Sequence, residues 1–464
     1  MLPEAFVKRI CAELGAAEGE ALCAALATQP AVGVRLHPDK AGALEQLPAL
    51  GAAEPIPWSP AGWTLAERPS FTLDSDFHAG AYYVQEPASQ FVGHLLQRTA
   101  AEGCRLLDMC AAPGGKTTLY ASLVGPEGLV VANEIDRRRA AVLADNVRKW
   151  GTGNVAVTVC EPRQLGELTG FFDVVAVDAP CSGEGMFRKD AEARSAWSEN
   201  NVRLCARRQE GILAEAWRAL RPGGTLIYST CTFNREEDEG SLERLLAAAG
   251  DEVGAAETVA VDEAWGIVCG AVGPFQTFRF FPHRTTGEGF FAAVARKRGA
   301  GESSRRIRPG GKGRRSPVAP ADRSEAREAA QWLLEPERMR FVTIAGTLYG
   351  WFGAQAEALQ LLSERLPVIY SGVALGQLFK GRLKPDAALA FSTALRRAAL
   401  PVAELDEAQA LDYLRRQEVA AAAFAEGLNL VCARGRALGF AKRIGARVNN
   451  GYPASLRIMK QQAI

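Results

Sequence analysis

The chain has 464 residues, enough for about three domains that each bury a core. Hydrophobic residues make up 48% of it and charged residues 23%, which excludes a disordered or collagen-like chain. No apolar run approaches the ~18 residues of a membrane-spanning helix. The N-terminus lacks the pattern of a secretory signal, and the 10 cysteines and 4 histidines show neither a disulfide framework nor metal-ligand spacing. We therefore expect a cytoplasmic protein with no membrane contact and no metal.

The net charge of +1 conceals two basic tracts on an otherwise acidic chain. From Lys297 to Pro320 there are eight Lys or Arg and one acid, and from Gly427 to Ile464 there are seven Lys or Arg and no acid. The rest of the chain then carries a net charge of −13. Such tracts indicate either contact with a polyanion or solvated surface charge, and the sequence leaves both interpretations open.

The predicted elements change in character along the chain. Residues 1–80 contain an Ala-rich amphipathic stretch from Ala5 to Ala27 and then short runs broken by prolines. Residues 81–297 alternate apolar runs with helical stretches, which predicts a parallel, doubly wound α/β sheet. Strands are predicted at 105–109, 129–134, 155–160, 173–177 and 225–229, helices at 137–150 and 202–220, and a closing antiparallel pair at 275–281 and 289–294.

The composition changes again after residue 297. Residues 298–320 are rich in Gly, Ser and Arg and too poor in apolar residues to pack, so they are predicted to form a basic flexible linker. Residues 321–464 are predicted to form a separate module, divided into a first C-terminal domain, 321–390, and a second, 391–464. In the second, the part after Gly427 has the pattern of short strands with glycine turns.

A loop of small residues follows the first strand of the predicted sheet. The run Asp108-Met109-Cys110-Ala111-Ala112-Pro113-Gly114-Gly115-Lys116-Thr117 leads from that strand into a helix. Paired glycines at such a turn let a ligand approach the backbone closely, at the carboxyl edge of the sheet. Glu134 ends the second strand, nineteen residues after Gly115, where an acid accepts hydrogen bonds from ribose hydroxyls. Asp178 ends the fourth strand at the same edge, and together these features predict a nucleoside-type ligand.

Two other nucleotide-binding motifs fit this loop poorly. The G-x-G-x-x-G fingerprint is absent, and Cys110 occupies the first glycine of the P-loop pattern G-x-x-x-x-G-K-[ST]. Pro113 also lacks the backbone N–H that a phosphate would need. The ligand class that remains is S-adenosylmethionine, which has a ribose and no phosphates.

Two cysteines follow neighbouring strand ends. Cys181 comes shortly after Asp178, and Cys231 comes directly after Thr230 at the end of the fifth strand. Both thiols should face the ligand crevice, although a cysteine taken alone is more often a small buried hydrophobe. Two thiols beside a methyl donor indicate covalent catalysis at an unreactive carbon such as carbon 5 of cytosine, with Asp178 holding the base. Their positions do not decide which thiol attacks.

These segments resemble the Nop/Sun family of RNA 5-methylcytosine methyltransferases, and within it the bacterial enzymes that modify small-subunit ribosomal RNA. The resemblance is strongest over residues 80–297. It rests on the runs Ala81 to Ser89, Asp108 to Lys116, Asp178 to Asp190 and Tyr228 to Thr232. Outside that range, Ile56-Pro57-Trp58 resembles the N-terminal region of such enzymes, and Gly439 to Lys442 with Asn450 to Pro453 resembles their PUA-like module.

The resemblance implies a Rossmann-like, S-adenosylmethionine-dependent methyltransferase core at 81–297. It also implies a small N-terminal α+β domain that faces RNA (1–80) and a C-terminal region that ends in a PUA-like, RNA-binding β module (391–464). The implied activity is methylation of carbon 5 of cytidine in ribosomal RNA through a covalent cysteine adduct. The implied partner is ribosomal RNA or the small ribosomal subunit, and the enzyme is expected to be a monomer.

The resemblance also implies roles for individual residues. Cys231 would be the nucleophile, Cys181 would assist product release, and Asp178 would complete the catalytic set. The expected cofactor contacts are Cys110, Ala111, Ala112, Pro113, Gly114, Gly115, Lys116, Glu134, Glu161 and Asp178. Glu161 stands where the family usually has Asp. Arg188, Lys189, Lys442 and Arg443 are candidate RNA contacts, with ordinary surface charge as the alternative.

Two other classes of function stay open at this point. A methyltransferase acting on a small molecule or a protein would leave the thiol pair and the basic tracts without a purpose. A non-catalytic RNA-binding or assembly factor could have kept the pocket, and a Cys231 variant that preserved cellular function would favour it.

Overall fold

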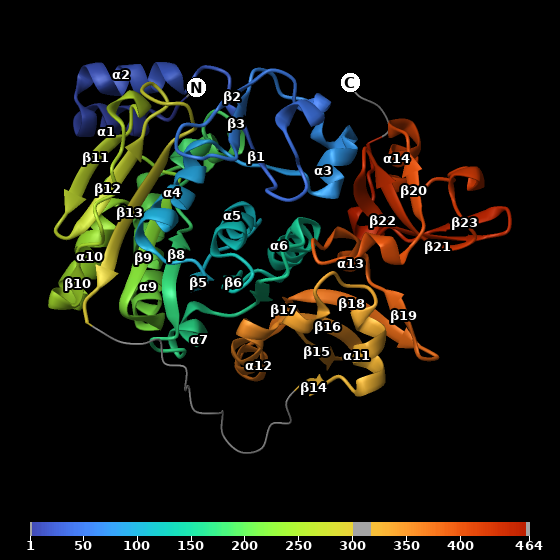
Figure 1. Cartoon of the computed structure of the whole chain (residues 1–464). Coiled ribbons are helices and arrows are strands. Elements are labelled where there is room, and N and C mark those ends of the chain that lie inside the picture. Colours follow the sequence, from blue (N-terminus) through green and yellow to red (C-terminus); the bar gives the residue numbers. More distant parts are fainter. Residues whose placement is uncertain (1, 300–316, 461–464) are drawn as a thin grey trace.

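The computed structural model describes residues 2–299 and 317–460, and within these ranges the chain folds around four β-sheets (Figure 1). No helix in the described ranges is both long enough and apolar enough to cross a membrane. The central sheet has 10 strands, in the order β11-β12-β13-β9-β8-β5-β6-β7-β17, with β10 paired to β13. The order β9-β8-β5-β6-β7 is wholly parallel, and the strands outside it are antiparallel to their neighbours. This arrangement is the predicted doubly wound α/β core.

The five parallel strands lie where the apolar runs predict them. Their bounds are Arg105–Asp108 (β5), Leu129–Asn133 (β6), Val155–Thr158 (β7), Phe172–Asp178 (β8) and Leu220–Thr230 (β9). The antiparallel strands are Val253–Gly254 (β10), Val268–Val272 (β11), Phe275–Phe280 (β12), Phe290–Lys297 (β13) and Val368–Ser371 (β17). The predicted closing pair is therefore confirmed as β12 and β13. Strand β9 begins earlier than expected, because the Arg-Pro-Gly-Gly segment after the long helix already lies within the strand.

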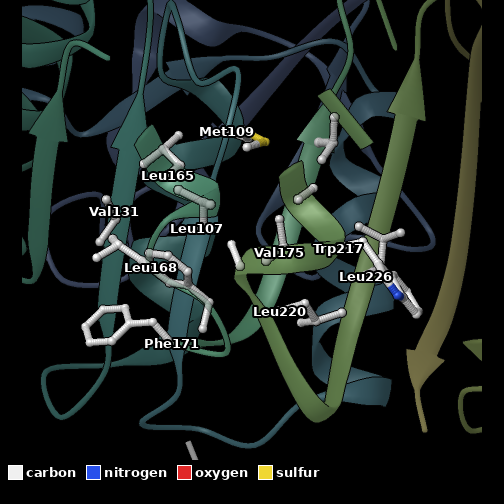
Figure 2. Packing of buried hydrophobic residues seen from close by; sticks show 14 of the residues in the cluster. Leu107, Met109, Val131, Leu165, Leu168, Phe171, Val175, Trp217, Leu220 and Leu226 are labelled. Atoms are coloured by element: carbon white, nitrogen blue, oxygen red, sulfur yellow. The ribbon is translucent and has the colours of Figure 1, made fainter. Parts of the chain in front are cut away.

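Helices cover both faces of the central sheet, so its strands are apolar on both sides. On one face are Phe91–Thr99 (α4), Gly115–Val124 (α5) and Arg137–Trp150 (α6). On the other are Pro162–Gly166 (α7), Glu199–Ala219 (α9), Glu239–Ala249 (α10) and Ala356–Arg365 (α12). Neighbouring strand residues point to opposite faces: Leu106 packs with the first set of helices and Leu107 with the second. Figure 2 shows Leu107, Val131 and Val175 in the second layer.

The N-terminal region is a small α+β unit. Its helices are Glu4–Leu14 (α1), Ala16–Ala25 (α2) and Ser75–Ala79 (α3), and its sheet has the order β2-β3-β1-β4. The strands are Val32–Leu36 (β1), Ala53–Pro55 (β2), Gly62–Leu65 (β3) and Tyr82–Val84 (β4). The stretch from Ala5 to Ala27 is two helices, because Gly15 has a φ of 86° and ends the first. Strand β4 extends this sheet slightly past the predicted boundary at residue 80.

The C-terminal region contains two further sheets. The first, β14-β15-β16-β18-β19, has strands Val318–Pro320 (β14), Met339–Ile344 (β15), Thr347–Phe352 (β16), Val373–Phe379 (β18) and Arg382–Pro385 (β19). The second has strands Val402–Leu405 (β20), Gly427–Ala433 (β21), Arg436–Ile444 (β22) and Arg447–Asn450 (β23). The remaining helices are Ala191–Ala196 (α8), Arg323–Ala330 (α11), Ala387–Phe391 (α13) and Glu407–Leu414 (α14).

Two features of this region differ from the sequence expectations. Most of the predicted linker, residues 300–316, lies outside the described residues, but its last part forms β14 and pairs with β15. The sequence predicts a separate first C-terminal domain, but β17 adds to the central sheet beside β7. Leu359 and Leu362 of α12 also pack into the hydrophobic core on one face of that sheet. The second difference arises because apolar residues of β17 and α12 pack against residues far back in the chain.

Candidate active site

The predicted site residues gather at the carboxyl edge of the parallel strands. Strand β5 ends at Asp108, β8 ends at Asp178, and β9 ends one residue before Cys231. Asp178 lies opposite Ser229 in the parallel pairing of β8 with β9. Because parallel neighbours end at the same edge, residues distant in sequence converge on one region.

The residues from Cys110 to Lys116 form the loop after β5 and the first turn of α5. Gly114 has a φ of 114°, and a Cβ at that position would lie 3.1 Å from Leu143 Cδ1. The loop carbonyls are held from outside: Arg139 donates to Ala112 O at 3.1 Å, and Asn146 Nδ2 donates to Pro113 O at 2.8 Å. These contacts fix the loop, and the absence of a side chain at Gly114 lets its backbone pass close to Leu143 of α6.

Two buried carboxyl groups flank the loop. Asp108 is 1% exposed, its Oδ2 accepts a hydrogen bond from Thr117 Oγ1 at 2.6 Å, and its Oδ1 has no partner among the described residues. Burial is the main cause that raises the pKa of Asp108 to about 7. The hydrogen bond from Thr117 and the charge of Lys116 oppose this shift, and the carboxylate of Asp178 adds to it. Glu134 has a 4% exposed side chain that pairs with Arg139 at 3.0 Å.

A lysine and an aspartate form an ion pair beside these groups. Lys116 Nζ lies 2.8 Å from Asp178 Oδ2, and Ser229 Oγ donates to Asp178 Oδ1 at 2.8 Å. Burial alone would lower the pKa of Lys116, but the carboxylate of Asp178 outweighs it and the pKa is raised. Lys116 is therefore charged and fixes the orientation of the Asp178 carboxylate.

The two candidate thiols are in contact. Cys181 Sγ and Cys231 Sγ lie 3.3 Å apart, which is a hydrogen-bond distance for thiols and much longer than the ~2.05 Å of a disulfide. The hydrogen bond to Cys231, followed by burial, raises the pKa of Cys181 well above its usual value. Cys181 is therefore a neutral thiol that faces its partner.

A buried polar network supports both cysteine loops, and the sequence analysis did not predict it. Glu237 Oε2 accepts a hydrogen bond from Ser182 N at 3.0 Å, in the loop of Cys181. Glu184 Oε2 accepts one from Phe233 N at 2.8 Å, in the loop of Cys231. Asn234 Nδ2 lies 2.8 Å from Glu237 Oε1 and 3.1 Å from Glu184 Oε1, and so joins the two. The signal was present as polar residues following both strand ends, but nothing in the sequence indicated that they are buried together.

The remaining predicted residues are not part of this cluster. Glu161 is exposed and caps the N-terminus of α7 together with Gln164. Arg188 has a 7% exposed side chain and pairs with Glu288 at 2.9 Å, so its guanidinium is used within the protein rather than presented to a partner. Lys189 and Lys442 are exposed, whereas Arg443 donates to the backbone carbonyl of Phe424 at 2.6 Å.

The basic tract at the C-terminus is likewise partly internal. Arg434 pairs with Asp76 at 2.8 Å and Arg436 pairs with the same carboxylate at 3.1 Å, although Asp76 belongs to α3 of the N-terminal unit. These two cations join the ends of the chain. The other basic tract, from Lys297 to Pro320, lies mostly outside the described residues.

The hydrogen-bond acceptors at this edge fit a cationic nucleoside such as S-adenosylmethionine. Asp108, Glu134 and Asp178 bring three carboxyl groups to the edge, where Lys116 pairs with Asp178 and Arg139 pairs with Glu134. Asp108 also has an oxygen without a hydrogen-bond partner among the described residues. A ligand with a ribose, an amino group and a sulfonium would satisfy these acceptors.

Three family models match successive parts of the chain. The N-terminal domain of 16S rRNA methyltransferase RsmF matches residues 2–87, 16S rRNA methyltransferase RsmB/F matches 95–296, and the methyltransferase RsmF PUA domain matches 401–458. In chain order, these three matches fall on the N-terminal sheet, the central sheet and the last C-terminal sheet.

Relatives are similar over most of the chain. The ribosomal RNA small subunit methyltransferase F of Erwinia tasmaniensis is 32% identical over 428 residues, which cover 87% of this chain and 85% of the relative. That of Klebsiella pneumoniae is 33% identical over 87% of this chain and 84% of the relative. Among solved structures, a methyltransferase homolog protein from Pyrococcus horikoshii is 26% identical with a TM-score of 0.53, over 64% of this chain and 95% of that chain. NSun6 from Pyrococcus horikoshii, at 19% identity and a TM-score of 0.53 over 64% of this chain and 98% of that chain, shares the fold.

Proposed function

This chain belongs to the RsmB/F family of 16S rRNA methyltransferases, and we propose how its own residues carry out S-adenosylmethionine-dependent methylation of carbon 5 of cytidine in ribosomal RNA. The substrate is small-subunit ribosomal RNA, as in the relatives' names. The proposal concerns which residues hold the cofactor, which thiol attacks and what positions the base.

The loop from Cys110 to Lys116 and the carboxylate of Glu134 would hold S-adenosylmethionine, with Glu134 accepting from the ribose hydroxyls. When bound, the cofactor supplies an electrophilic methyl group. The partnerless oxygen of Asp108 supports a polar contact from the same ligand. Glu161 is a further candidate contact, although its present partners belong to the cap of α7.

Cys231 would act as the nucleophile. Its thiolate adds to carbon 6 of the cytosine, and the electron pair of the 5,6 double bond makes carbon 5 nucleophilic toward the methyl group. After methylation, a general base takes the proton from carbon 5, the electrons of that C–H bond re-form the 5,6 double bond, and the Cys231 thiolate leaves from carbon 6. The target base must be unstacked to reach this sulfur.

Asp178 and Cys181 would assist the same reaction, Asp178 by binding the base and Cys181 by helping product release. The Asp178 carboxylate is 34% exposed and held by Lys116. It can therefore accept a hydrogen bond from the exocyclic amine of the base, and from the ring nitrogen once that nitrogen is protonated as charge moves there. Cys181, a neutral thiol beside the nucleophile, would assist release of the methylated product. The single observation that carries this assignment is the contact between the two sulfurs at the edge that also holds Lys116 and Asp178.

The remaining parts of the proposal concern partners and place. Lys189 and Lys442 are exposed and would contact RNA phosphates, so binding should weaken as salt increases. All ten cysteines are free thiols, which fits a reducing, cytoplasmic location, where ribosomal RNA is also found. We further propose that the enzyme acts as a monomer.

The experiment uses labelled S-adenosylmethionine with naked 16S rRNA and, in parallel, with small ribosomal subunits. Cys231→Ala should abolish methyl transfer to both, while its affinity for the cofactor stays at the wild-type value. Bisulfite sequencing of the wild-type product then locates the modified cytidine. Methylation by the Cys231→Ala protein would overturn the assignment of the nucleophile.

A further inference from the structure

A cavity of about 310 Å³ lies between the N-terminal unit and α6. Its walls include the rings of Phe71, Phe77, Tyr83 and Trp150, and two cations, Arg68 and Lys149, also line it. We call these six residues the aromatic pocket. None of them belongs to the catalytic cluster described above.

The two cations contact aromatic rings, and no carboxylate of the described residues forms an ion pair with either of them. Lys149 Nζ lies 4.4 Å from the centroid of the Phe77 ring, and the Arg68 guanidinium carbon lies 5.4 Å from that of Phe71. Neither side chain has a hydrogen bond or an ion pair among residues 2–299 and 317–460. Burial lowers the pKa of Lys149 to about 8, an effect that the charge of Asp145 opposes. A partly buried ammonium with no carboxylate partner is costly, and an anion arriving from outside would relieve that cost.

The aromatic pocket borders the catalytic region on one side. Tyr83 OH donates to Pro113 O at 3.3 Å, and Asn146, which also lines the cavity, donates to the same carbonyl at 2.8 Å. Pro113 belongs to the loop predicted to hold the cofactor. On the other side, α3 carries both Phe77 of the pocket and Asp76, which pairs with Arg434 of the C-terminal module. A chain reaching from the active site toward the C-terminal module would therefore pass this cavity.

We propose that the aromatic pocket binds one nucleotide of the RNA substrate, distinct from the methylated cytidine, with its base stacked on the rings and its phosphate bound by Lys149 and Arg68. The aromatic rings can stack on the flat base of a nucleotide, and the two cations beside them can bind its phosphate. The volume lies at the lower end of the range for small-ligand sites and accommodates a nucleoside. An unstacked base is required, so the pocket takes single-stranded RNA. This inference rests on the proposed function, because it presumes an RNA substrate.

The test uses full-length protein and a fluorescein-labelled single-stranded RNA of twelve nucleotides, titrated by anisotropy at several salt concentrations. Lys149→Met keeps the apolar stem and removes the charge, Arg68→Gln removes the other charge, and Phe77→Leu removes a ring. The matched control is Arg203→Gln, whose exposed cation lies on α9 at the opposite face of the central sheet. Methylation of naked 16S rRNA gives KM and kcat for each variant.

Each pocket variant should weaken RNA binding about tenfold, the size of one lost stacking or charged contact. The charge variants should lower the slope of log Kd against log salt by about 1, and the loss should appear as a higher KM for RNA. Lys149→Met should melt no earlier than the wild type, because it removes an unpaired buried charge. The control should match the wild type throughout.

Wild-type RNA affinity in all three pocket variants would overturn the proposal. It would also be overturned if Arg203→Gln weakened RNA binding as much as the pocket variants do. Displacement of the RNA by millimolar cytidine monophosphate supports a nucleotide site, whereas displacement by an acidic peptide and not by the nucleotide would assign the cavity to a protein partner and overturn it. The RNA titration does not depend on catalysis. If the pocket variants bound RNA weakly and the Cys231→Ala protein still methylated RNA, the role of Cys231 as nucleophile would be rejected. The proposal that the aromatic pocket binds a nucleotide would stand.

Discussion

The sulfur atoms of Cys181 and Cys231 lie 3.3 Å apart, although the two residues are 50 positions apart in the sequence. Each follows one of two neighbouring parallel strands, β8 and β9, and the register that places Asp178 opposite Ser229 brings the two loops together. The same register places the Lys116–Asp178 pair at this edge. The contact is therefore a consequence of strand order, and it has consequences for catalysis.

Replacing Cys181 with Ala should trap the reaction after the first thiol has added. If Cys231 attacks and Cys181 assists release, Cys181→Ala protein incubated with 16S rRNA and cofactor accumulates a covalent protein–RNA adduct, visible as a shifted band under denaturing conditions. The double variant Cys181→Ala/Cys231→Ala is the control and should give no adduct. An adduct in the double variant would show that another nucleophile is at work.

The polar network behind the two thiols should control the rate. Asn234→Ala removes the side chain that joins Glu184 and Glu237, both of which are 1% exposed or less. Leaving these carboxyl groups short of donors should cost about 1–3 kcal/mol of stability. Because both cysteine loops are hydrogen-bonded to these groups, kcat should fall at least tenfold while KM for RNA changes little.

The matched control for this prediction is Asn200→Ala, which removes an exposed amide from α9. It should leave kcat and the melting temperature unchanged. A fall in kcat no larger than the fraction of Asn234→Ala protein that is unfolded at the assay temperature would instead indicate lost folding rather than misplaced thiols.

Much of the fold and part of the site could be predicted from the sequence. Strands buried on both faces read as continuous apolar runs, so β5 to β9 were located to within a few residues, apart from the start of β9. The loop after β5 and the two cysteines follow strand ends, so topology alone places them at one edge. Glu184, Asn234 and Glu237 could not be found in this way, because the burial that makes them a network is set by packing between loops.

The pairing of the C-terminal cations could not be predicted from the sequence either. A run of seven Lys or Arg without an acid suggests a surface for a polyanion, yet Arg434 and Arg436 both reach Asp76, about 360 residues earlier. The sequence shows charge but not the distance to a partner. The sequence does not reveal that β17 joins the central sheet, for the same reason: its pairing partner β7 lies about 210 residues earlier.

Removing Arg434 should loosen the contact between the two ends of the chain. Arg434 pairs with Asp76 at 2.8 Å and Glu407 at 3.0 Å, and it does so with a φ of 46°, a backbone conformation that an arginine seldom adopts. Arg434→Ala should cost about 2 kcal/mol, because Arg436 still neutralises Asp76. Hydrogen exchange should increase in α3 and β22.

The control for Arg434→Ala is Arg447→Ala, a change to an exposed cation of β23 in the same module. Its exchange pattern should match that of the wild type. Unchanged exchange in α3 of the Arg434→Ala protein would mean that apolar packing alone holds the module in place.

Asp108 should make the stability of the cofactor-free protein depend on pH. Its pKa in the folded protein is raised to about 7, first by burial, from an ordinary value of 3.8. The folded protein therefore holds a proton that the unfolded chain releases above about pH 4. This contribution to stability is fully present below that pH and is lost as the pH rises through about 7, and a shift of this size corresponds to roughly 4 kcal/mol.

Asp108→Asn removes the titration and should keep the hydrogen bond from Thr117. The difference in urea midpoint between the wild type and Asp108→Asn should thus change in favour of the variant from about pH 4 to about pH 7 and then level off. The exposed change Asp251→Asn should follow the wild type. A pH-independent difference would mean that the buried carboxyl is ionised throughout and is compensated by Lys116. The same variant should also bind S-adenosylmethionine more weakly, because an amide nitrogen then replaces the oxygen that has no partner among the described residues, and that nitrogen cannot accept a hydrogen bond from the ligand.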